Sequence, residues 1–158
     1  HEHFASECLV SFLNEKWRQM NVRKTGPRVL ITTLPGEGYS LGILMCAVIT
    51  SITNSKIMYL GLNSPIEEIV DASEKYNAEL VTISISHNFD FVTSEKLLSQ
   101  LRKKINKDTP IVTGGKGSPC NIEGIDYIAS FQKYYNFLTD ANQSQVALNT
   151  SHSFKNIN

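Results

Sequence analysis

Residues 28–42 read RVLITTLPGEGYSLG and contain three kinds of local signal in a fixed order. The run from Arg28 to Leu34 is rich in aliphatic and β-branched residues, which predicts a buried strand. Residues 35–40 carry a proline and two glycines, which predicts a turn. Residues 41–52 form an apolar run that predicts a helix. A strand, a turn and a helix in succession are the repeating unit of a parallel α/β sheet.

The same alternation continues along the chain. We expect further strands at residues 56–60, 80–86, 110–113 and 127–129, and further helices at residues 65–76, 92–105 and 131–141. Ser64, followed by Pro65 and Glu67, predicts an N-cap and capping box for the helix that begins there. Five strands separated by helices predict a flavodoxin-like five-stranded parallel sheet of order 2-1-3-4-5, with helices on both faces.

Two flanking segments differ from this pattern. Residues 3–20 carry apolar side chains at helical spacing and predict an amphipathic helix with no sequence partner in this chain. We therefore expect residues 1–21 to end a helical-bundle cap, residues 22–27 to be a linker and residues 28–141 to form the α/β domain. From residue 142 onward Asn, Ser and Gln dominate, and residues 142–158 are expected to be a flexible tail.

Composition excludes several classes of function. The 15 basic and 15 acidic residues balance, so no net charge attracts nucleic acid, and no apolar run is long enough to span a membrane. The three cysteines have no CxxC spacing, which argues against a zinc site or a disulfide framework and favours a cytoplasmic location. The chain begins inside a helical pattern without an initiator Met, so we expect a further domain upstream.

Polar and glycine-rich segments follow three of the expected strands. They are residues 36–40, 84–88 and 114–117, and each of them contains glycine or serine. In a doubly wound sheet these strand exits meet where the strand order reverses, which is where ligands bind. Glycines there let a ligand approach the backbone, although a single glycine cluster can also be an ordinary turn. Three clusters at one edge predict a pocket.

Common nucleotide motifs do not account for this pocket. Gly36, Gly38 and Gly42 are spaced as GxGxxxG, which differs from the dinucleotide GxGxxG pattern, and no Gly-Lys-Ser/Thr of a P-loop is present. Glu37 would repel the phosphate of a flavin nucleotide.

The three loops together resemble the cobalamin-binding domains of methyltransferases and light-sensing transcription regulators. That family carries Asp-x-His-x-x-Gly after the first strand, Ser-x-Leu at the third and Gly-Gly after the fourth. The corresponding residues here are Glu37, Gly38, Tyr39 and Gly42, then Ser84 and Ser86, then Gly114 and Gly115. The segment 59–70 and the ending Gly124 to Ala129 also resemble the family, and Glu2 and His3 resemble the last helix of its four-helix cap.

The resemblance implies roles for these residues. In the family the His binds cobalt from below and the Asp orients it. By resemblance, Gly42, Ser84, Gly114 and Gly115 are expected to line the channel for the cofactor's nucleotide tail, and Glu2 and His3 to face the upper ligand. Tyr39 replaces the His and supplies no neutral nitrogen. No metal ligand is therefore assigned, and His87 or His3 are the weaker imidazole candidates.

This departure leaves three outcomes open. The domain binds cobalamin in an adenosyl, methyl or hydroxo form with the cofactor's own base on cobalt. It binds another tetrapyrrole such as haem. In the third outcome, the domain has lost the cofactor and serves as a protein-interaction module.

Two functions are compatible with the resemblance. One is a sensory or regulatory domain, such as a photoreceptor, whose ligand changes the oligomeric state of a transcription regulator with an upstream DNA-binding domain. The other is a corrinoid carrier for methyl transfer. No nucleophile–base pair or paired carboxylates appear at the expected edge, so we do not expect the chain itself to be an enzyme.

Overall fold

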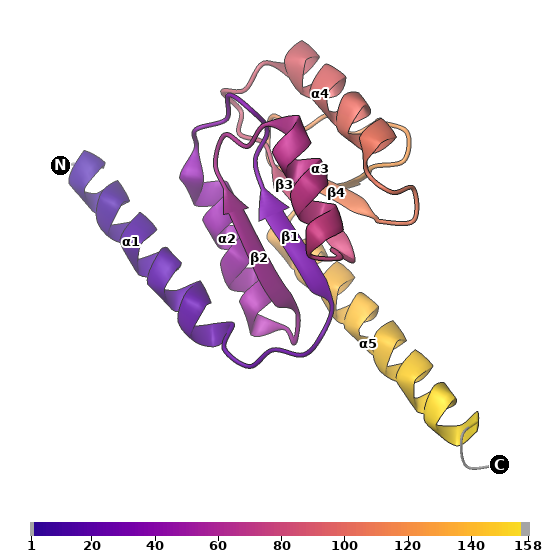
Figure 1. Cartoon of the computed structure of the whole chain (residues 1–158). Helices are drawn as coiled ribbons and strands as arrows, with labels where there is room; N and C mark the ends of the chain where they lie inside the picture. Colours follow the sequence, from indigo (N-terminus) through magenta and orange to yellow (C-terminus); the bar gives the residue numbers. More distant parts are fainter. Residues whose placement is uncertain (1, 156–158) are drawn as a thin grey trace.

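The sheet has five parallel strands. The computed structural model describes the backbone of residues 2–155 and the side chains of residues 4–144 and 148. The strands are β1 (Arg28–Thr32), β2 (Lys56–Gly61), β3 (Leu80–Ser84), β4 (Ile111–Gly114) and β5 (Asp126–Ile128). Their order is β2-β1-β3-β4-β5 (Figure 1), which confirms the predicted topology. The strand order therefore reverses between β1 and β3, as expected.

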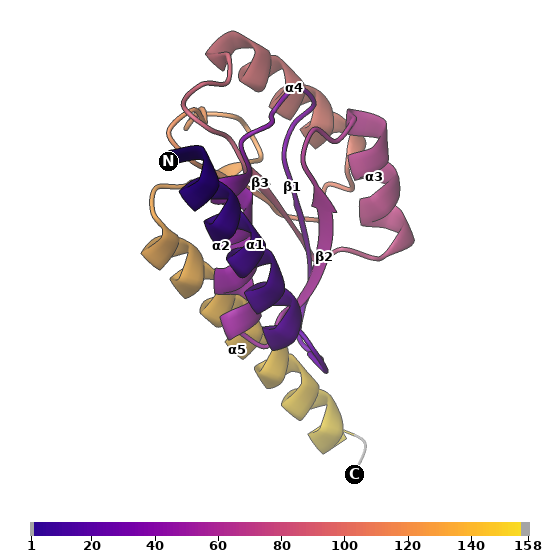
Figure 2. The same ribbon diagram turned by 90° about the vertical axis from the view of Figure 1, so that its left-hand side faces the viewer.

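Helices cover both faces of the sheet. They are α1 (Glu2–Met20), α2 (Ser40–Ile52), α3 (Ile66–Lys75), α4 (Phe91–Lys104) and α5 (Phe131–Lys155). One face is covered by α3 and α4, and the other by α1, α2 and α5 (Figures 1 and 2). Among the described helices, none is both long and apolar enough to cross a membrane.

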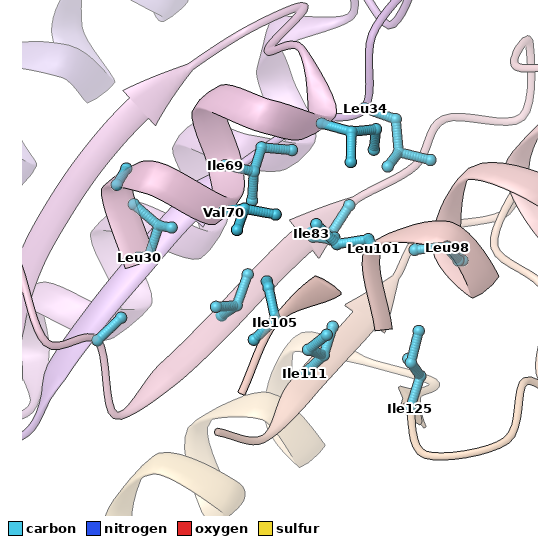
Figure 3. Packing of buried hydrophobic residues seen from close by; sticks show 14 of the residues in the cluster. Leu30, Leu34, Ile69, Val70, Ile83, Leu98, Leu101, Ile105, Ile111 and Ile125 are labelled. Atoms are coloured by element: carbon cyan, nitrogen blue, oxygen red, sulfur yellow. The ribbon is translucent and has the colours of Figure 1, made fainter. Parts of the chain in front are cut away.

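Two hydrophobic clusters result from the alternation of side chains along the buried strands. In β1, Leu30 belongs to the cluster beneath α3 and α4, whereas Val29 and Ile31 belong to the cluster beneath α2 and α5. Figure 3 shows the first cluster, in which Ile69 of α3 and Leu101 of α4 lie over the sheet. All five side chains are at most 1% exposed. A parallel sheet buried on both faces requires apolar residues at successive positions, as these strands have.

Helix α1 packs on α2 through one face. Leu13 and Trp17 are both 8% exposed, and the Trp17 ring stacks on Tyr59 of β2 with centroids 5.2 Å apart. Phe4 and Phe12 are 72% and 53% exposed on the same helix. The predicted amphipathic helix is therefore present, and part of its apolar surface is left uncovered by the described chain.

Two local predictions were wrong. The last helix, expected to end near Ala141, continues to Lys155, because no glycine or proline interrupts residues 131–155. Ser64 does not cap α3, since its Oγ accepts a hydrogen bond from Thr32 Oγ1 at 2.9 Å and Pro65 occupies the N-cap position without a side-chain bond. The Ser64 hydroxyl therefore bonds the distant residue Thr32 and not the backbone at the start of α3 that the local motif predicts.

Candidate cofactor-binding site

Glu37 ties together the loops that leave β1 and β3. Its side chain is 4% exposed. Its Oε2 accepts a hydrogen bond from the backbone N–H of Ser86 at 2.8 Å, and its Oε1 accepts from Ser86 Oγ at 3.1 Å and from the backbone N–H of Tyr39 at 2.9 Å. The carboxylate is therefore occupied by the loops themselves. Within the described structure it makes no hydrogen bond with the side chain of residue 39, the contact that the family resemblance implies for its Asp.

The loop after β1 is also fixed by Asn63, which follows β2. The backbone N–H of Gly36 donates to Asn63 Oδ1 at 2.6 Å, and the backbone N–H of Asn63 donates to Thr33 Oγ1 at 2.9 Å. Gly36 has φ +89°, a conformation that favours glycine. The turn around residues 33–37 is consequently held from both sides.

A cavity of about 290 Å³ lies between the first half of α2, the ends of β3, β4 and β5, and the start of α5. Ser84, Gly42, Gly114 and Gly115, the four positions expected to form a tail channel, all line it. Most of the remaining wall is apolar or aromatic. It comprises Cys46, Thr82, Ile83, Val112, Thr113, Lys116, Tyr127, Ile128, Ala129, Ser130, Phe131 and Tyr134.

Glycines at the rim of this cavity bring loops into direct contact. A Cβ on Gly42 would lie 2.5 Å from Ser84 Oγ. Gly115 has φ +102°, and a Cβ there would lie 2.1 Å from the backbone oxygen of Ile85. A Cβ on Gly117 would lie 1.9 Å from the backbone oxygen of Ser86. The loop after β4 thus packs backbone to backbone against the end of β3.

A chain of buried hydroxyls lies beside the cavity. Thr50 Oγ1 donates to the Cys46 carbonyl at 2.7 Å, and the Tyr134 hydroxyl lies 2.9 Å from Thr50 Oγ1 and 3.0 Å from Thr82 Oγ1. Because the single hydrogen of Thr50 goes to Cys46, Tyr134 donates to Thr50 and Thr82 donates to Tyr134. Burial raises the pKa of the Tyr134 hydroxyl, and it raises that of the Cys46 thiol to about 12. Both groups are therefore neutral at physiological pH.

Sequence reasoning missed these residues. Tyr134 meets Thr50 across 84 positions and Thr82 across 52, so no local spacing signals the contact. Cys46 is 9% exposed on the buried side of α2. Only the helix periodicity of α2 and α5 could have placed these side chains on an inner face.

The other predicted site residues lie outside the cavity lining. Tyr39 is 48% exposed at the N-cap position of α2, and His87 is exposed on the loop after β3. A Cβ on Gly38 would meet open space. Glu2 and His3 begin α1, and their side chains lie outside the described part of the structure. Among the described residues, no group of three His, Cys, Asp or Glu could hold a metal ion.

One protein family model matches most of this chain. The B12 binding domain family matches residues 27–128, which include every strand and the loops around the cavity. This chain belongs to the B12-binding domain family. No curated protein sequence matches it significantly.

Solved structures with a similar fold include B12-binding proteins of low sequence identity. A cobalamin-binding protein from Desulfitobacterium hafniense is 16% identical, with a TM-score of 0.60, over 72% of this chain and 58% of that one. The monomethylamine corrinoid protein of Methanosarcina barkeri is 15% identical, with a TM-score of 0.60, over 84% and 63%. The methanol:cobalamin methyltransferase complex of the same organism is 16% identical, with a TM-score of 0.59, over 75% and 48%. The chain spans about half to two-thirds of these structures.

The residues present fit cobalamin in one respect and depart from it in another. The cavity is lined mainly by apolar and aromatic side chains, together with Ser84 and the glycines that the family resemblance assigns to a tail channel. Residue 39 is a phenol, so the position of the usual imidazole ligand supplies no nitrogen. The B12-binding fold thus carries a tyrosine at the position that the family resemblance assigns to the imidazole ligand.

Proposed function

We propose that this chain is a cobalamin-binding sensory or regulatory domain that takes the cofactor's nucleotide tail into the cavity between α2, β3 and β4. The observation that carries this proposal is the convergence of Gly42, Ser84, Gly114 and Gly115 on one cavity in a chain of the B12-binding family. A haem or other tetrapyrrole without a nucleotide tail would leave that cavity unused.

The lining supplies the contacts that a nucleotide tail needs. Gly42 and Gly115 are part of the lining, and the Ser84 hydroxyl at the end of β3 lies against Gly42, where it can hydrogen-bond a ligand. Apolar side chains exclude water from the inner part, whereas Lys116, the one charged residue of the lining, is exposed at the rim, where it suits a phosphate. When bound, cobalamin supplies a cobalt–carbon bond that light or a methyl acceptor can break.

A carrier for methyl transfer is the second candidate. Two of the structures with this fold are a corrinoid protein and a cobalamin methyltransferase complex, which favours it. Tyr39 makes the carrier role less favourable, because the carriers of this family use an imidazole ligand at the position that Tyr39 occupies by resemblance. We therefore favour the regulatory role, with an upstream DNA-binding domain, a ligand-dependent oligomer and a cytoplasmic location as further parts of the proposal.

The first experiment tests binding at the cavity. Purified protein is incubated with hydroxo-, methyl- or adenosylcobalamin and dialysed, and the retained absorbance is measured. Ala129→Trp, at an exposed position of the cavity lining, is expected to weaken retention at least about tenfold by filling the entrance. Ala141→Trp, on the exposed side of α5, is the matched control and is expected to bind normally.

Two results would contradict the proposal. One is a wild-type protein that retains no corrinoid. The other is an Ala129→Trp variant that binds as tightly as the wild type, since the tail would then lie elsewhere.

The second experiment distinguishes the sensor from the carrier. The full-length protein with adenosylcobalamin is analysed by light scattering in the dark and after green light, and the methylcobalamin form is mixed with a thiol acceptor. A light-dependent change of mass without methyl transfer supports the sensor. Methyl transfer at constant mass supports the carrier.

A further inference from the structure

The lower face of a bound corrinoid has two conventional sources of nitrogen, namely the base of its own nucleotide tail and an imidazole of the protein. The structure bears on both. The inference drawn here rests on the proposed function, because it concerns the state of cobalamin once it is bound.

The cavity disfavours coordination of cobalt by the base of the cofactor's own tail. Its lining is mainly apolar, and its volume is about 290 Å³. If the tail base stayed on cobalt, this apolar lining would remain in contact with water, whereas entry of the tail buries it. Binding therefore favours the form in which the base has left the metal.

Residue 39 does not supply the second source, a protein imidazole, because it is a tyrosine. A phenol must lose its proton to bind a metal well, and it offers no nitrogen in either form. Within the described structure the Tyr39 hydroxyl makes no hydrogen bond, and the nearby Glu37 carboxylate accepts hydrogen bonds from the Tyr39 and Ser86 backbones and from Ser86 Oγ instead. Residue 39 therefore offers cobalt no nitrogen ligand.

His87 does not replace the missing ligand. It carries the only imidazole among the described side chains, and it is exposed on the loop after β3. A metal-binding His usually donates its second ring N–H to an oriented carboxylate or carbonyl. Within the described structure the His87 ring makes no hydrogen bond, so neither a carboxylate nor a carbonyl orients it.

We propose that this domain holds cobalamin with the tail base in the cavity and with no nitrogen ligand on the lower face of cobalt, where the family resemblance places Tyr39. Because no tail nitrogen has to reach the metal, the site accepts corrinoids whose tail base cannot coordinate cobalt, such as those with a phenolic base. It discriminates against cobinamide, which lacks the tail.

Electron paramagnetic resonance of the cob(II)alamin-loaded protein tests this directly. A nitrogen ligand on cobalt(II) splits each cobalt line into a triplet, and its absence leaves the lines unsplit. The wild type and Tyr39→Phe are both expected to give unsplit lines. Tyr39→His is expected to give the triplet, which becomes a doublet when the histidine is labelled with ¹⁵N in the ring.

Each other result overturns the inference in an identifiable way. A triplet in the wild type that survives His87→Ala places the tail base on cobalt, and a triplet lost in His87→Ala makes His87 the ligand. A Tyr39→His protein that is folded by circular dichroism and loaded, yet shows no triplet, means that residue 39 does not face the metal. In all three cases cobalamin is bound, so the proposed function stands. Failure to retain cobalamin at all contradicts that function instead.

Discussion

The buried carboxylate of Glu37 is the polar group on which the shape of the site depends most. It accepts two hydrogen bonds from Ser86, which join the loops after β1 and β3, and one from the Tyr39 backbone within its own loop. Glu37→Gln places an amide N–H₂ opposite one of these donors, so we expect the free energy of unfolding to fall by about 2 kcal/mol. Urea denaturation measures the loss.

The matched control for Glu37 is Glu68→Gln on the exposed side of α3. Its effect on the free energy of unfolding is expected to stay within about 0.5 kcal/mol. Equal effects of the two substitutions would mean that the loop contacts of Glu37 contribute nothing beyond a surface charge.

Cys46 makes the stability of the protein depend on alkaline pH. Burial raises its pKa from 9.0 to about 12, so the folded protein keeps the thiol proton at pH values where the unfolded chain has lost it. The contribution of Cys46 is therefore complete below pH 9 and is lost as pH rises toward 12, by about 1.4 kcal/mol per pH unit. Urea denaturation of Cys46→Val under reducing conditions should show a flatter pH profile than the wild type.

The exposed Cys120 provides the comparison for this pH effect. Cys120→Val should keep the wild-type slope. A Cys46→Val profile that falls as steeply as the wild type would assign the alkaline loss to other groups, such as Tyr134, whose pKa is also raised by burial.

Among the elements, α1 packs on the α/β unit through Leu13 and Trp17, and Trp17 is the larger of the two. Its ring is 8% exposed and stacks on Tyr59. Trp17→Ala should lower the free energy of unfolding by about 3–5 kcal/mol, or release α1 alone, because it removes a large buried side chain. Phe12→Ala, at a 53% exposed position of the same helix, should have an effect within about 0.5 kcal/mol.

Denaturation followed by circular dichroism measures both α1 variants, and protease digestion reveals whether α1 has separated from the rest. If Trp17→Ala and Phe12→Ala were equally mild and α1 stayed protected, the Trp17 contact would not be what holds the helix.

The elements were predictable where their signals are local, and they were not where a distant partner intervenes. The run RVLITTL and its following glycines gave the first strand and turn, because β-branched residues and glycine act within a few positions. Ser64 misled, because its hydroxyl bonds Thr32 across 32 positions. The end of α5 was placed too early because its polar composition resembles that of a tail, although nothing in it breaks a helix.

The site residues, too, were predictable where their signals are local and unpredictable where they depend on distant packing. Glycines and Ser84 were predictable from strand ends and from the family resemblance, and they line one cavity. The hydroxyl chain through Tyr134 depends on the packing of α5 against α2, which single-sequence patterns do not specify.

For the whole molecule, binding and stability should be linked. A ligand that binds only the folded state raises the free energy of unfolding by about 2.7 kcal/mol at a hundredfold excess over Kd. For a chain of this size that raises Tm by about 5–10 °C. Differential scanning calorimetry with hydroxocobalamin should show this rise in the wild type and in Ala141→Trp, but not in Ala129→Trp. An equal rise in all three proteins would place binding outside the cavity.

The backbone contacts of Gly115 and Gly117 with the end of β3 have a consequence for how fast a cofactor can enter. Gly115 lines the cavity, and two main chains in direct contact cannot shift toward each other, so we expect this part of the cavity wall to be rigid before a cofactor arrives. Association should then follow diffusion and the bulk of the incoming molecule, without a slow opening step. Stopped-flow traces would accordingly show an observed rate that rises linearly with cobalamin concentration and reaches no plateau.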